Sequence, residues 1–355
     1  MEGYAILNIV GLDERDRWNS IVKSFHNWDV YYLQEYAQAF YLHGDGVPFL
    51  IDYQDSESRF CYVVMKSDIA DAPQFCGILE RGKFYDLETP YGYGGPLSDS
   101  PISEQSQRLF LHELKDRENS EILVSQFVRF HPLLMNHNAA PLIFETRYLH
   151  DTIFIDTASP DLILTNMDSK NRNMVRKAKK NGVIIEYRPV DDYQEFIPIY
   201  EETMRRDHAT AYYYFGEEYF RIQTKLKNNA CFFFAMKDDK AIAAAMIYYN
   251  EKFCHYHLAG TAADYRKYAP SNLLLYETAT WASRRGITKF HLGGGITQND
   301  SLYGFKKQFN RNGRLSFVIG RTIFNKEAYQ MLLDAREKLD HEFDRNNNRM
   351  IQYRA

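Results

Sequence analysis

HYHLAGTAADYRKYAPSNLLLYETATWASRRGITKFHLGGGITQNDSLYGFKKQFN, residues 255–310, has the pattern of a strand, a loop, a helix, a strand, a glycine turn and a helix. A short aromatic strand at 255–258 precedes a segment, 271–285, whose apolar residues recur at helical spacing until Gly286. A second short strand follows at 289–292. Two strands joined by a helix predict a βαβ unit, in which ligands bind where loops leave the carboxyl ends of the strands.

Three consecutive glycines, 293–295, follow the second of these strands. They lack the Lys-Ser/Thr pair of a P-loop and the later glycine of a dinucleotide-binding fingerprint, so a nucleotide site is not indicated. Glycine lets a ligand approach the backbone closely. We therefore expect Gly293 and Gly294 to contact an acyl group or a peptide.

Six segments of the chain occur in an order that resembles the FemAB-like, or Fem-type, branch of the GNAT acyltransferase superfamily. They are TPYGYGGP (89–96), SKNRNMVRKAKKNGV (169–183), HLAGT, PSNLLLYETATWASRRGI, KFHLGGG and SLYGFKKQFN. Fem-type enzymes build peptidoglycan cross-bridges. The resemblance implies a mixed α/β fold of tandem GNAT-like domains, each with a partly splayed β-sheet flanked by helices.

The same resemblance implies a transferase that moves an aminoacyl or acyl group to an amine of a cell-wall peptide or glycan precursor. One alternative is an acyl-CoA-dependent N-acyltransferase acting on an amino sugar or another small amine. A second alternative is a non-catalytic GNAT-like protein that holds a glycan or peptide in an aromatic groove.

Length and composition predict a globular protein with two domains. A chain of 355 residues is longer than one hydrophobic core usually accommodates. A content of 45% hydrophobic and 25% charged residues is typical of a globular protein. The net charge of −4 gives no global attraction to nucleic acid or anionic membranes, so such contacts require a local patch. No segment approaches the ~20 apolar residues of a membrane span. The first residues also lack a signal-peptide pattern, so we expect a cytoplasmic protein.

The two halves of the chain predict the same order of elements. The first half predicts a helix at 31–43, strands at 47–53, 59–66 and 84–89, a helix at 103–118, and strands at 122–130 and 153–156. The second half predicts a strand at 183–188, helices at 192–207 and 217–227, a hairpin of 231–236 with 241–249, and then the βαβ unit. We predict an N-terminal GNAT-like domain at 1–157 and a C-terminal one, with the transfer site, at 158–325. A packing helix and a polar, frayed tail occupy 326–355.

The segment 90–96 predicts a shaped loop, because three glycines and two prolines in seven residues cannot hold a regular strand. Tyr91 and Tyr93 lie within it. They are candidate substrate contacts, since irregular loops on a rigid scaffold often bind ligands. The alternative is that both tyrosines cap the core.

The chain has one dense basic cluster, on a helix predicted at 169–181. Arg172, Arg176 and Lys180 align at four-residue steps, and no residue from 170 to 180 is acidic. Either this is a solvated helix face or it binds a phosphate-bearing ligand. The ligand would be a phosphorylated acceptor, a lipid-linked pyrophosphate or the backbone of a tRNA.

Other chemistries have little support in the sequence. There is no Gly-x-Ser-x-Gly elbow and no plausible cysteine nucleophile, so a covalent acyl-enzyme is not indicated. His255 and His257 point to one face of a strand, but no third ligand has recognisable spacing. We therefore expect no metal site, and His257 is a candidate groove residue.

Direct transfer to an amine needs a proton acceptor and positive charge or N–H groups at the developing oxyanion. Phe305 and Lys306 match the position where Fem-type enzymes carry a Phe-Lys pair thought to stabilise the transition state. The resemblance thus implies that Phe305 and Lys306 are catalytic. The neighbouring Lys307 leaves this assignment ambiguous by one residue, and a surface lysine is the alternative.

Our prediction of the acyl donor rests on the loop at 266–271. Coenzyme A users of the GNAT superfamily resemble Gln/Arg-x-x-Gly-x-Gly/Ala, whose backbone N–H groups hold a pyrophosphate. Here Ala269 and Pro270 replace flexible residues, and Pro270 has no N–H. We therefore expect aminoacyl-tRNA as donor by resemblance, acyl-CoA as the alternative, no tightly bound cofactor, and substrate contacts from Arg266 and Tyr268.

Overall fold

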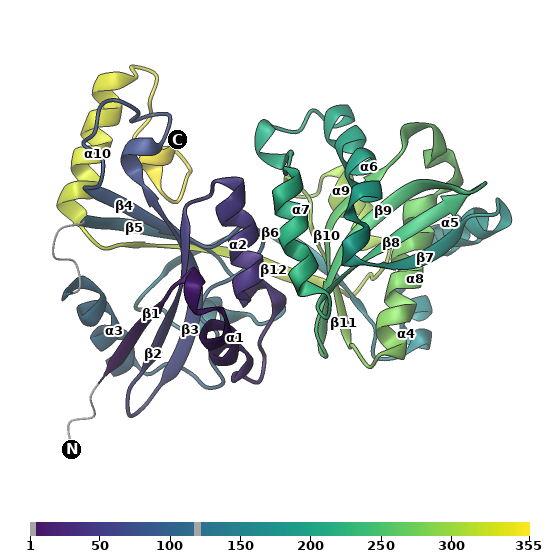
Figure 1. The fold of residues 1–355 in the computed structure, drawn as a ribbon, viewed down its shortest axis with the longest axis horizontal. Coiled ribbons are helices and arrows are strands. Elements are labelled where there is room, and N and C mark those ends of the chain that lie inside the picture. The colour runs from purple at the N-terminus through teal and green to yellow at the C-terminus, as the bar shows by residue number, and fades with distance from the viewer. Residues whose placement is uncertain (1–4, 117–121) are drawn as a thin grey trace. The chain divides into compact units, whose positions relative to one another are not determined.

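The structure, a computed structural model, describes residues 5–116 and 122–355, which form two compact units (Figure 1). Unit 1 comprises residues 1–149 and 317–355, and unit 2 comprises 150–316. Among the described residues, none of the helices combines the length and the apolar character needed to cross a bilayer.

Unit 1 is a mixed sheet with helices on both faces. Its strands have the order β1-β2-β3-β4-β5-β12. Only β4 and β5 are parallel; all other neighbours are antiparallel. The elements are β1 (Ile6–Val10), α1 (Arg15–Lys23), α2 (Gln34–His43), β2 (Val47–Gln54), β3 (Arg59–Asp68), β4 (Phe84–Glu88), α3 (Glu104–Asp116), β5 (Ile122–Arg129), β12 (Arg314–Ile323, from residue 317) and α10 (Lys326–Leu339).

Unit 2 repeats this topology. Its strands have the order β7-β8-β9-β10-β11-β6, and only β10 and β11 are parallel. The elements are β6 (Glu145–Asp156, from residue 150), α4 (Pro160–Asn166), α5 (Ser169–Lys180), β7 (Ile184–Pro189), α6 (Tyr193–Arg206), α7 (Glu217–Gln223), β8 (Ala230–Lys237), β9 (Lys240–Tyr249), β10 (Phe253–Thr261), α8 (Pro270–Arg284), β11 (Lys289–Gly294) and α9 (Ser301–Lys307). The mixed α/β class and the βαβ unit β10-α8-β11 are confirmed.

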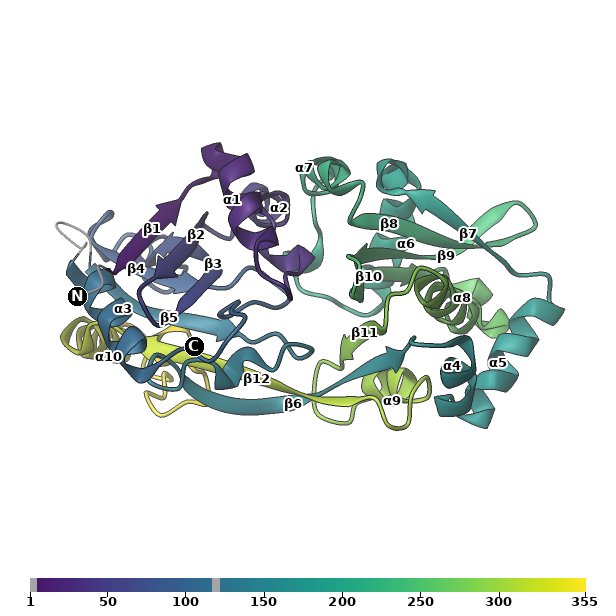
Figure 2. The ribbon, with the colours of Figure 1, turned by 90° about the horizontal axis from the view of Figure 1, so that it is seen from below.

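Alternation along β8 shows how helices cover both faces of the second sheet. The ring of Phe232 lies 4.9 Å from that of Phe196 on α6. The next residue, Phe233, points to the opposite face and lies 5.4 Å from Trp281 on α8. On that face α4 and α5 lie side by side with α8 (Figure 2).

The division of the chain differs from the predicted boundaries. It falls inside β6 and inside β12, rather than near residue 157 and at 325, and residues 317–355 return to unit 1. The predicted frayed tail is wrong, because Met350, Ile351 and Tyr353 are buried. Ile351 and Tyr353 pack with α10 in one apolar cluster.

Two elements at the start of unit 1, β1 and α1, were not predicted from the sequence. The predicted helix at 103–118 corresponds to α3, and its positions 117–118 lie outside the described residues.

Candidate functional site

The parallel strands β10 and β11 pair at only three positions, from Phe253–Lys289 to His255–His291. Beyond these, within the described residues, no pairing joins the two strands, although β10 continues to Thr261 and β11 to Gly294. In unit 1 the corresponding parallel strands, β4 and β5, pair at five positions, although β4 is shorter than β10. Unit 2 therefore has the predicted splay at the carboxyl ends of its parallel strands.

A register irregularity lies on the outer side of each splayed strand. Tyr256 and Leu258 pair with consecutive residues of β9, which leaves His257 as an extra residue. On β11, His291 and Gly293 pair with consecutive residues of β6, which leaves Leu292 as the extra one. Such bulges bend a strand and increase its local twist, which gives a physical reason for the separation.

Lys306 on α9 is buried beside the end of β11. Its side chain is 7% exposed, and its Nζ donates a hydrogen bond of 2.7 Å to the carbonyl oxygen of Gly294. The same Nζ lies 5.9 Å from the ring centre of Tyr256 on β10. Burial lowers the pKa of Lys306 to about 8, and the Asp300 carboxylate partly opposes that shift. Lys307 is exposed, so only Lys306 places a buried cation at the splay.

The glycines at the end of β11 are required by the geometry. Gly293 has a φ of 73°, in the left-handed region that favours glycine. A Cβ on Gly294 would lie 2.6 Å from the His150 ring and 2.8 Å from the Asp151 carbonyl oxygen. A side chain there would displace the carbonyl group that binds Lys306.

Asp300 caps the N-terminus of α9 and is not among the residues predicted from the sequence. Its carboxylate accepts hydrogen bonds from the backbone N–H groups of Ile296, Thr297 and Tyr303. Burial alone would raise the pKa of Asp300, but these backbone donors lower it overall. The Asn-Asp-Ser run at 299–301 was the available signal, because Asp is a preferred N-cap residue.

Phe305 on α9 and His257 on β10 each lie beside an aromatic side chain of unit 2. The Phe305 ring meets that of Phe309 at 5.4 Å in a T-shaped contact against the unit 2 core. His257 Nε2 lies 2.8 Å from the Tyr219 hydroxyl. Burial, with a smaller contribution from His255, lowers the pKa of His257 to about 3, so this imidazole is neutral at physiological pH.

The loop before α8 is a 3-10 helix, Ala263–Tyr268, followed by Ala269 with a φ of 57°. The Ala269 N–H donates to the Arg266 carbonyl oxygen at 3.0 Å, and Pro270 begins α8. These two positions therefore offer no free backbone donor. The Arg266 side chain is exposed, and the half-buried Tyr268 ring lies 5.1 Å from Lys237 Nζ.

The predicted basic helix is α5, and its two named arginines differ in environment. The Arg172 guanidinium donates to the Leu164 carbonyl at 3.1 Å and to the Met167 carbonyl, so it stabilises the end of α4. Arg176 is exposed and donates only to Asn173 among the described residues. Lys170, Lys177 and Lys180 are also exposed.

Tyr91 and Tyr93 belong to unit 1, whereas the other nine candidate residues belong to unit 2. The Tyr36 hydroxyl donates to the Tyr91 carbonyl oxygen. The Tyr93 ring makes T-shaped contacts with Tyr31 at 5.4 Å and Phe317 at 5.4 Å. Both tyrosines therefore anchor the 90–96 loop within the first unit.

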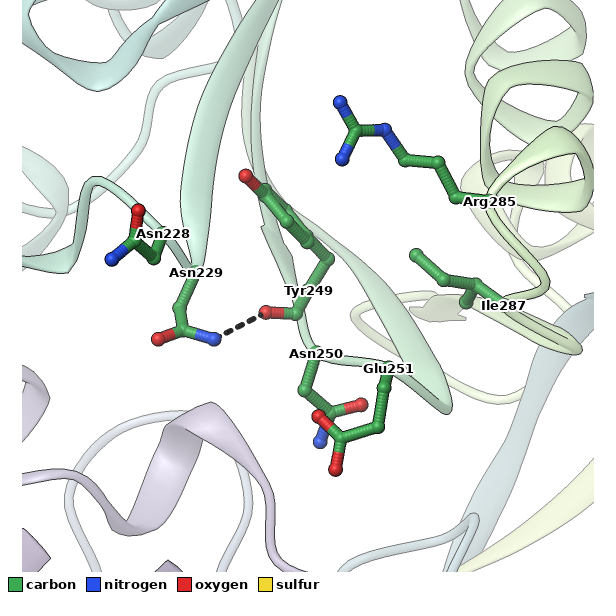
Figure 3. Close-up of a pocket in the computed structure, with 7 residues that line it drawn as sticks. All are labelled: Asn228, Asn229, Tyr249, Asn250, Glu251, Arg285 and Ile287. Atoms are coloured by element: carbon green, nitrogen blue, oxygen red, sulfur yellow. Dashed lines mark hydrogen bonds between the residues drawn. The ribbon is translucent and has the colours of Figure 1, made fainter.

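Two cavities lie away from these residues. One of about 190 Å³ in unit 2 lies at the end of β9, where Asn229 donates to the Tyr249 carbonyl oxygen at 3.0 Å and Arg285 lines the opposite wall (Figure 3). Since β10 begins just after this point, at Phe253, the cavity lies at the opposite end of β10 from the splay. The other, of about 500 Å³, is lined entirely by unit 1.

Residues 167–307 match the family model of the acetyltransferase (GNAT) domain. This range contains all nine candidate residues of unit 2. No curated protein matches the sequence significantly.

Three solved structures share the fold. FemX is 14% identical with a TM-score of 0.68, and the match covers 92% of this chain and 99% of that one. A conserved protein of unknown function from Bacteroides thetaiotaomicron is 11% identical with a TM-score of 0.57, covering 90% and 100%. L-PGS from Bacillus licheniformis is 12% identical with a TM-score of 0.54, covering 90% and 96%. The predicted Fem-like form of the GNAT fold is confirmed.

Proposed function

Because this chain is an acyltransferase with a GNAT domain at residues 167–307 and a Fem-like fold, we propose that it moves an aminoacyl group to an amine of a cell-wall peptide or glycan precursor. The observation that carries the proposal is the buried Lys306 ammonium beside the splayed ends of β10 and β11. A solvated surface lysine, the alternative for this residue, would not have its Nζ bound to a backbone carbonyl inside the domain.

The proposed reaction is direct attack of a neutral amine on the acyl carbonyl carbon. A C–N bond forms, the C–O bond to the donor breaks, and the amine proton passes to the leaving hydroxyl group. An ammonium group has three N–H donors, of which Gly294 takes one. The remaining donors of Lys306 would stabilise the negative charge that develops on the carbonyl oxygen.

We propose aminoacyl-tRNA as the donor. The loop before α8 has lost two backbone donors of a pyrophosphate cradle, at Ala269 and Pro270. Exposed positive charge lies nearby on Arg266 and Lys267. Lys237 lies between this charge and α5: its Nζ donates to the Asn181 carbonyl at 2.9 Å, faces the Tyr268 ring and pairs with Asp238 at 3.2 Å.

A basic surface without a defined pyrophosphate cradle suits the backbone of an RNA better than a coenzyme. The acceptor would then be a phosphorylated cell-wall or glycan precursor, and the reaction would take place in the cytoplasm, where charged tRNA is available. Acyl-CoA-dependent acylation of a small amine is the competing activity.

The donor is tested by offering the protein each candidate separately. We expect charged tRNA with a peptidoglycan precursor to give an aminoacylated product detectable by mass spectrometry. We expect acetyl-coenzyme A to give no thermal stabilisation, whereas a typical site at a hundredfold excess over Kd would add about 2.7 kcal/mol. Stabilisation by acetyl-coenzyme A together with acetylation of an amine would overturn the proposal.

A further inference from the structure

The cavity of about 500 Å³ in unit 1 lies at the carboxyl ends of the parallel strands β4 and β5. Glu88, the last residue of β4, and Arg129, the last residue of β5, both line it. In open α/β sheets ligands bind at this end of parallel strands. Because the two units share one topology, the cavity occupies in unit 1 the position that the splay of β10 and β11 occupies in unit 2.

The charges that line this cavity are predominantly positive. Its ionisable lining residues are the arginines Arg129, Arg147, Arg349 and Arg354 and the acids Asp86 and Glu88. Arg354 Nε pairs with Asp86 at 2.9 Å, and Arg129 faces Glu88 at 3.8 Å. Each carboxylate is thus matched by one guanidinium, and two guanidinium groups are left over.

These two guanidinium groups, of Arg147 and Arg349, are not neutralised by the protein. Arg147 donates to the Asn348 carbonyl oxygen at 2.7 Å, which is a neutral partner. Within the part of the chain that the structure describes, no carboxylate pairs with either group. Both side chains are exposed at the cavity, so they can bind an anion that enters from solvent.

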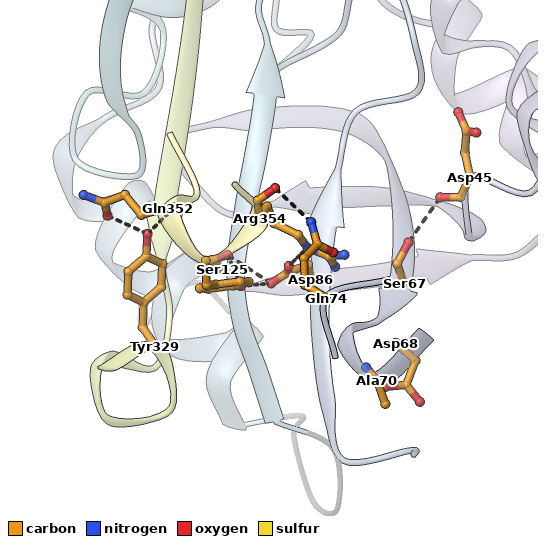
Figure 4. Close-up of polar contacts among 11 residues, drawn as sticks. Asp45, Ser67, Asp68, Ala70, Gln74, Asp86, Ser125, Tyr329, Gln352 and Arg354 are labelled. Atoms are coloured by element: carbon orange, nitrogen blue, oxygen red, sulfur yellow. Dashed lines mark hydrogen bonds and ion pairs between the residues drawn. The ribbon is translucent and has the colours of Figure 1, made fainter. Parts of the chain in front are cut away.

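Hydrogen bonds join the last residues of the chain to the sheet beside the cavity (Figure 4). The Tyr353 hydroxyl and Arg354 Nε both donate to Asp86, and Gln74 donates to the Arg354 carbonyl oxygen at 3.2 Å. Tyr329 on α10 donates to Gln352 at 2.8 Å. These contacts hold residues 352–354 against the sheet beside the cavity.

The remaining lining is partly apolar, with Phe127, Ile319 and Met350 packed in one cluster. Small-molecule sites typically have volumes of about 300–1,000 Å³ and combine an apolar body with a few placed polar groups. Guanidinium groups match the geometry of phosphate oxygens. We propose that this cavity is a binding site for a small phosphate-bearing molecule, with Arg147 and Arg349 contacting the phosphate. This site uses no residue of the proposed transfer site.

The test measures binding of inorganic phosphate and of inorganic pyrophosphate to the whole protein by calorimetry. Because a hydrogen bond to a charged group contributes about 1.5–3 kcal/mol, we expect Arg147→Ala and Arg349→Ala each to weaken binding by roughly tenfold to a hundredfold. Arg349→Lys should weaken binding less than Arg349→Ala. Arg108→Ala, an exposed arginine of unit 1 outside the cavity, is the matched control and should bind normally.

Two further variants separate this site from the transfer site. Binding should survive Lys306→Met and Arg176→Glu, whichever donor the enzyme uses. Loss of binding in either variant, or equal affinity in Arg147→Ala, Arg349→Ala and wild type, would overturn the proposal. Failure of the wild type to bind phosphate or pyrophosphate would overturn it, as would tighter binding of citrate than of either phosphate compound.

Discussion

Replacing Lys306 by methionine should stabilise the protein at neutral pH while it removes the proposed catalytic cation. Burial lowers the pKa of Lys306 from 10.5 to about 8. A difference of one pKa unit corresponds to 1.36 kcal/mol, so keeping this lysine charged at neutral pH costs on the order of 3 kcal/mol. Methionine has a similar shape and no charge, but it loses the hydrogen bond to Gly294, which is worth about 1 kcal/mol. The expected net gain is therefore about 2 kcal/mol at pH 7.

The pH dependence of this gain follows from the direction of the shift. The folded protein releases the Lys306 proton at a lower pH than the unfolded chain does, so the wild type gains stability as pH rises from about 8 to about 10.5. The methionine variant has no such titration. Its advantage should therefore be largest below pH 8 and should shrink to near zero by about pH 10.

Urea unfolding of the wild type and of Lys306→Met, at about pH 7 and again at about pH 10, measures this difference in stability. Lys307→Met, at the exposed neighbouring position, is the control and should change stability by no more than about 0.5 kcal/mol. Destabilisation by Lys306→Met at pH 7, or a difference that does not change with pH, would refute the reasoning.

Two other substitutions test the surroundings of Lys306. Gly294→Ala should lower the transfer rate by roughly tenfold to a hundredfold with little change in tRNA affinity. The reason is that a Cβ would meet the His150 ring and displace the carbonyl group that holds Lys306. An unchanged single-turnover rate would contradict this. The double variant Arg176→Glu with Lys180→Glu should weaken tRNA binding and reduce its salt dependence, as measured by filter binding across a salt series, because both side chains are exposed on α5. An unchanged tRNA affinity at low salt would show that the basic side of α5 is only a solvated surface.

Much of the fold could be predicted because the decisive elements have local signals. The βαβ unit around α8 has a helical apolar pattern that ends at Gly286, and the strands of the β8–β9 hairpin are almost entirely buried. In contrast, β1 is a five-residue edge strand with two buried residues, and α1 buries only Trp18 and Val22. Such short patterns are weak evidence in a sequence.

The burial of the last residues could not be predicted because it depends on distant partners. The segment after residue 344 is polar in sequence, yet Tyr353 binds Asp86, which is 267 positions away. Likewise, β6 and β12 are strands whose neighbours in the sheets come from distant parts of the chain. The local sequence does not indicate which distant strands will pair.

The sequence singles out candidate site residues, but it does not predict their surroundings. The resemblance pointed to Phe305 and Lys306, and the burial of Lys306 beside an exposed Lys307 distinguishes the two lysines. The spacing of Arg172 and Arg176 predicted one shared face, yet Arg172 is occupied by the carbonyl groups at the end of α4. Helical spacing predicts which side chains share a face, but it does not show which of them another element uses.

The most direct test is the rate of aminoacyl transfer from charged tRNA to a peptidoglycan precursor by wild type, Lys306→Met and Lys307→Met under identical conditions. Removing one group that stabilises an oxyanion lowers kcat by roughly a hundredfold to a thousandfold, and we expect this loss for Lys306→Met with normal activity for Lys307→Met. The wild-type rate should also fall above about pH 8, as the Lys306 ammonium loses its proton. Equal rates for Lys306→Met and wild type would contradict the claim that Lys306 stabilises the transition state.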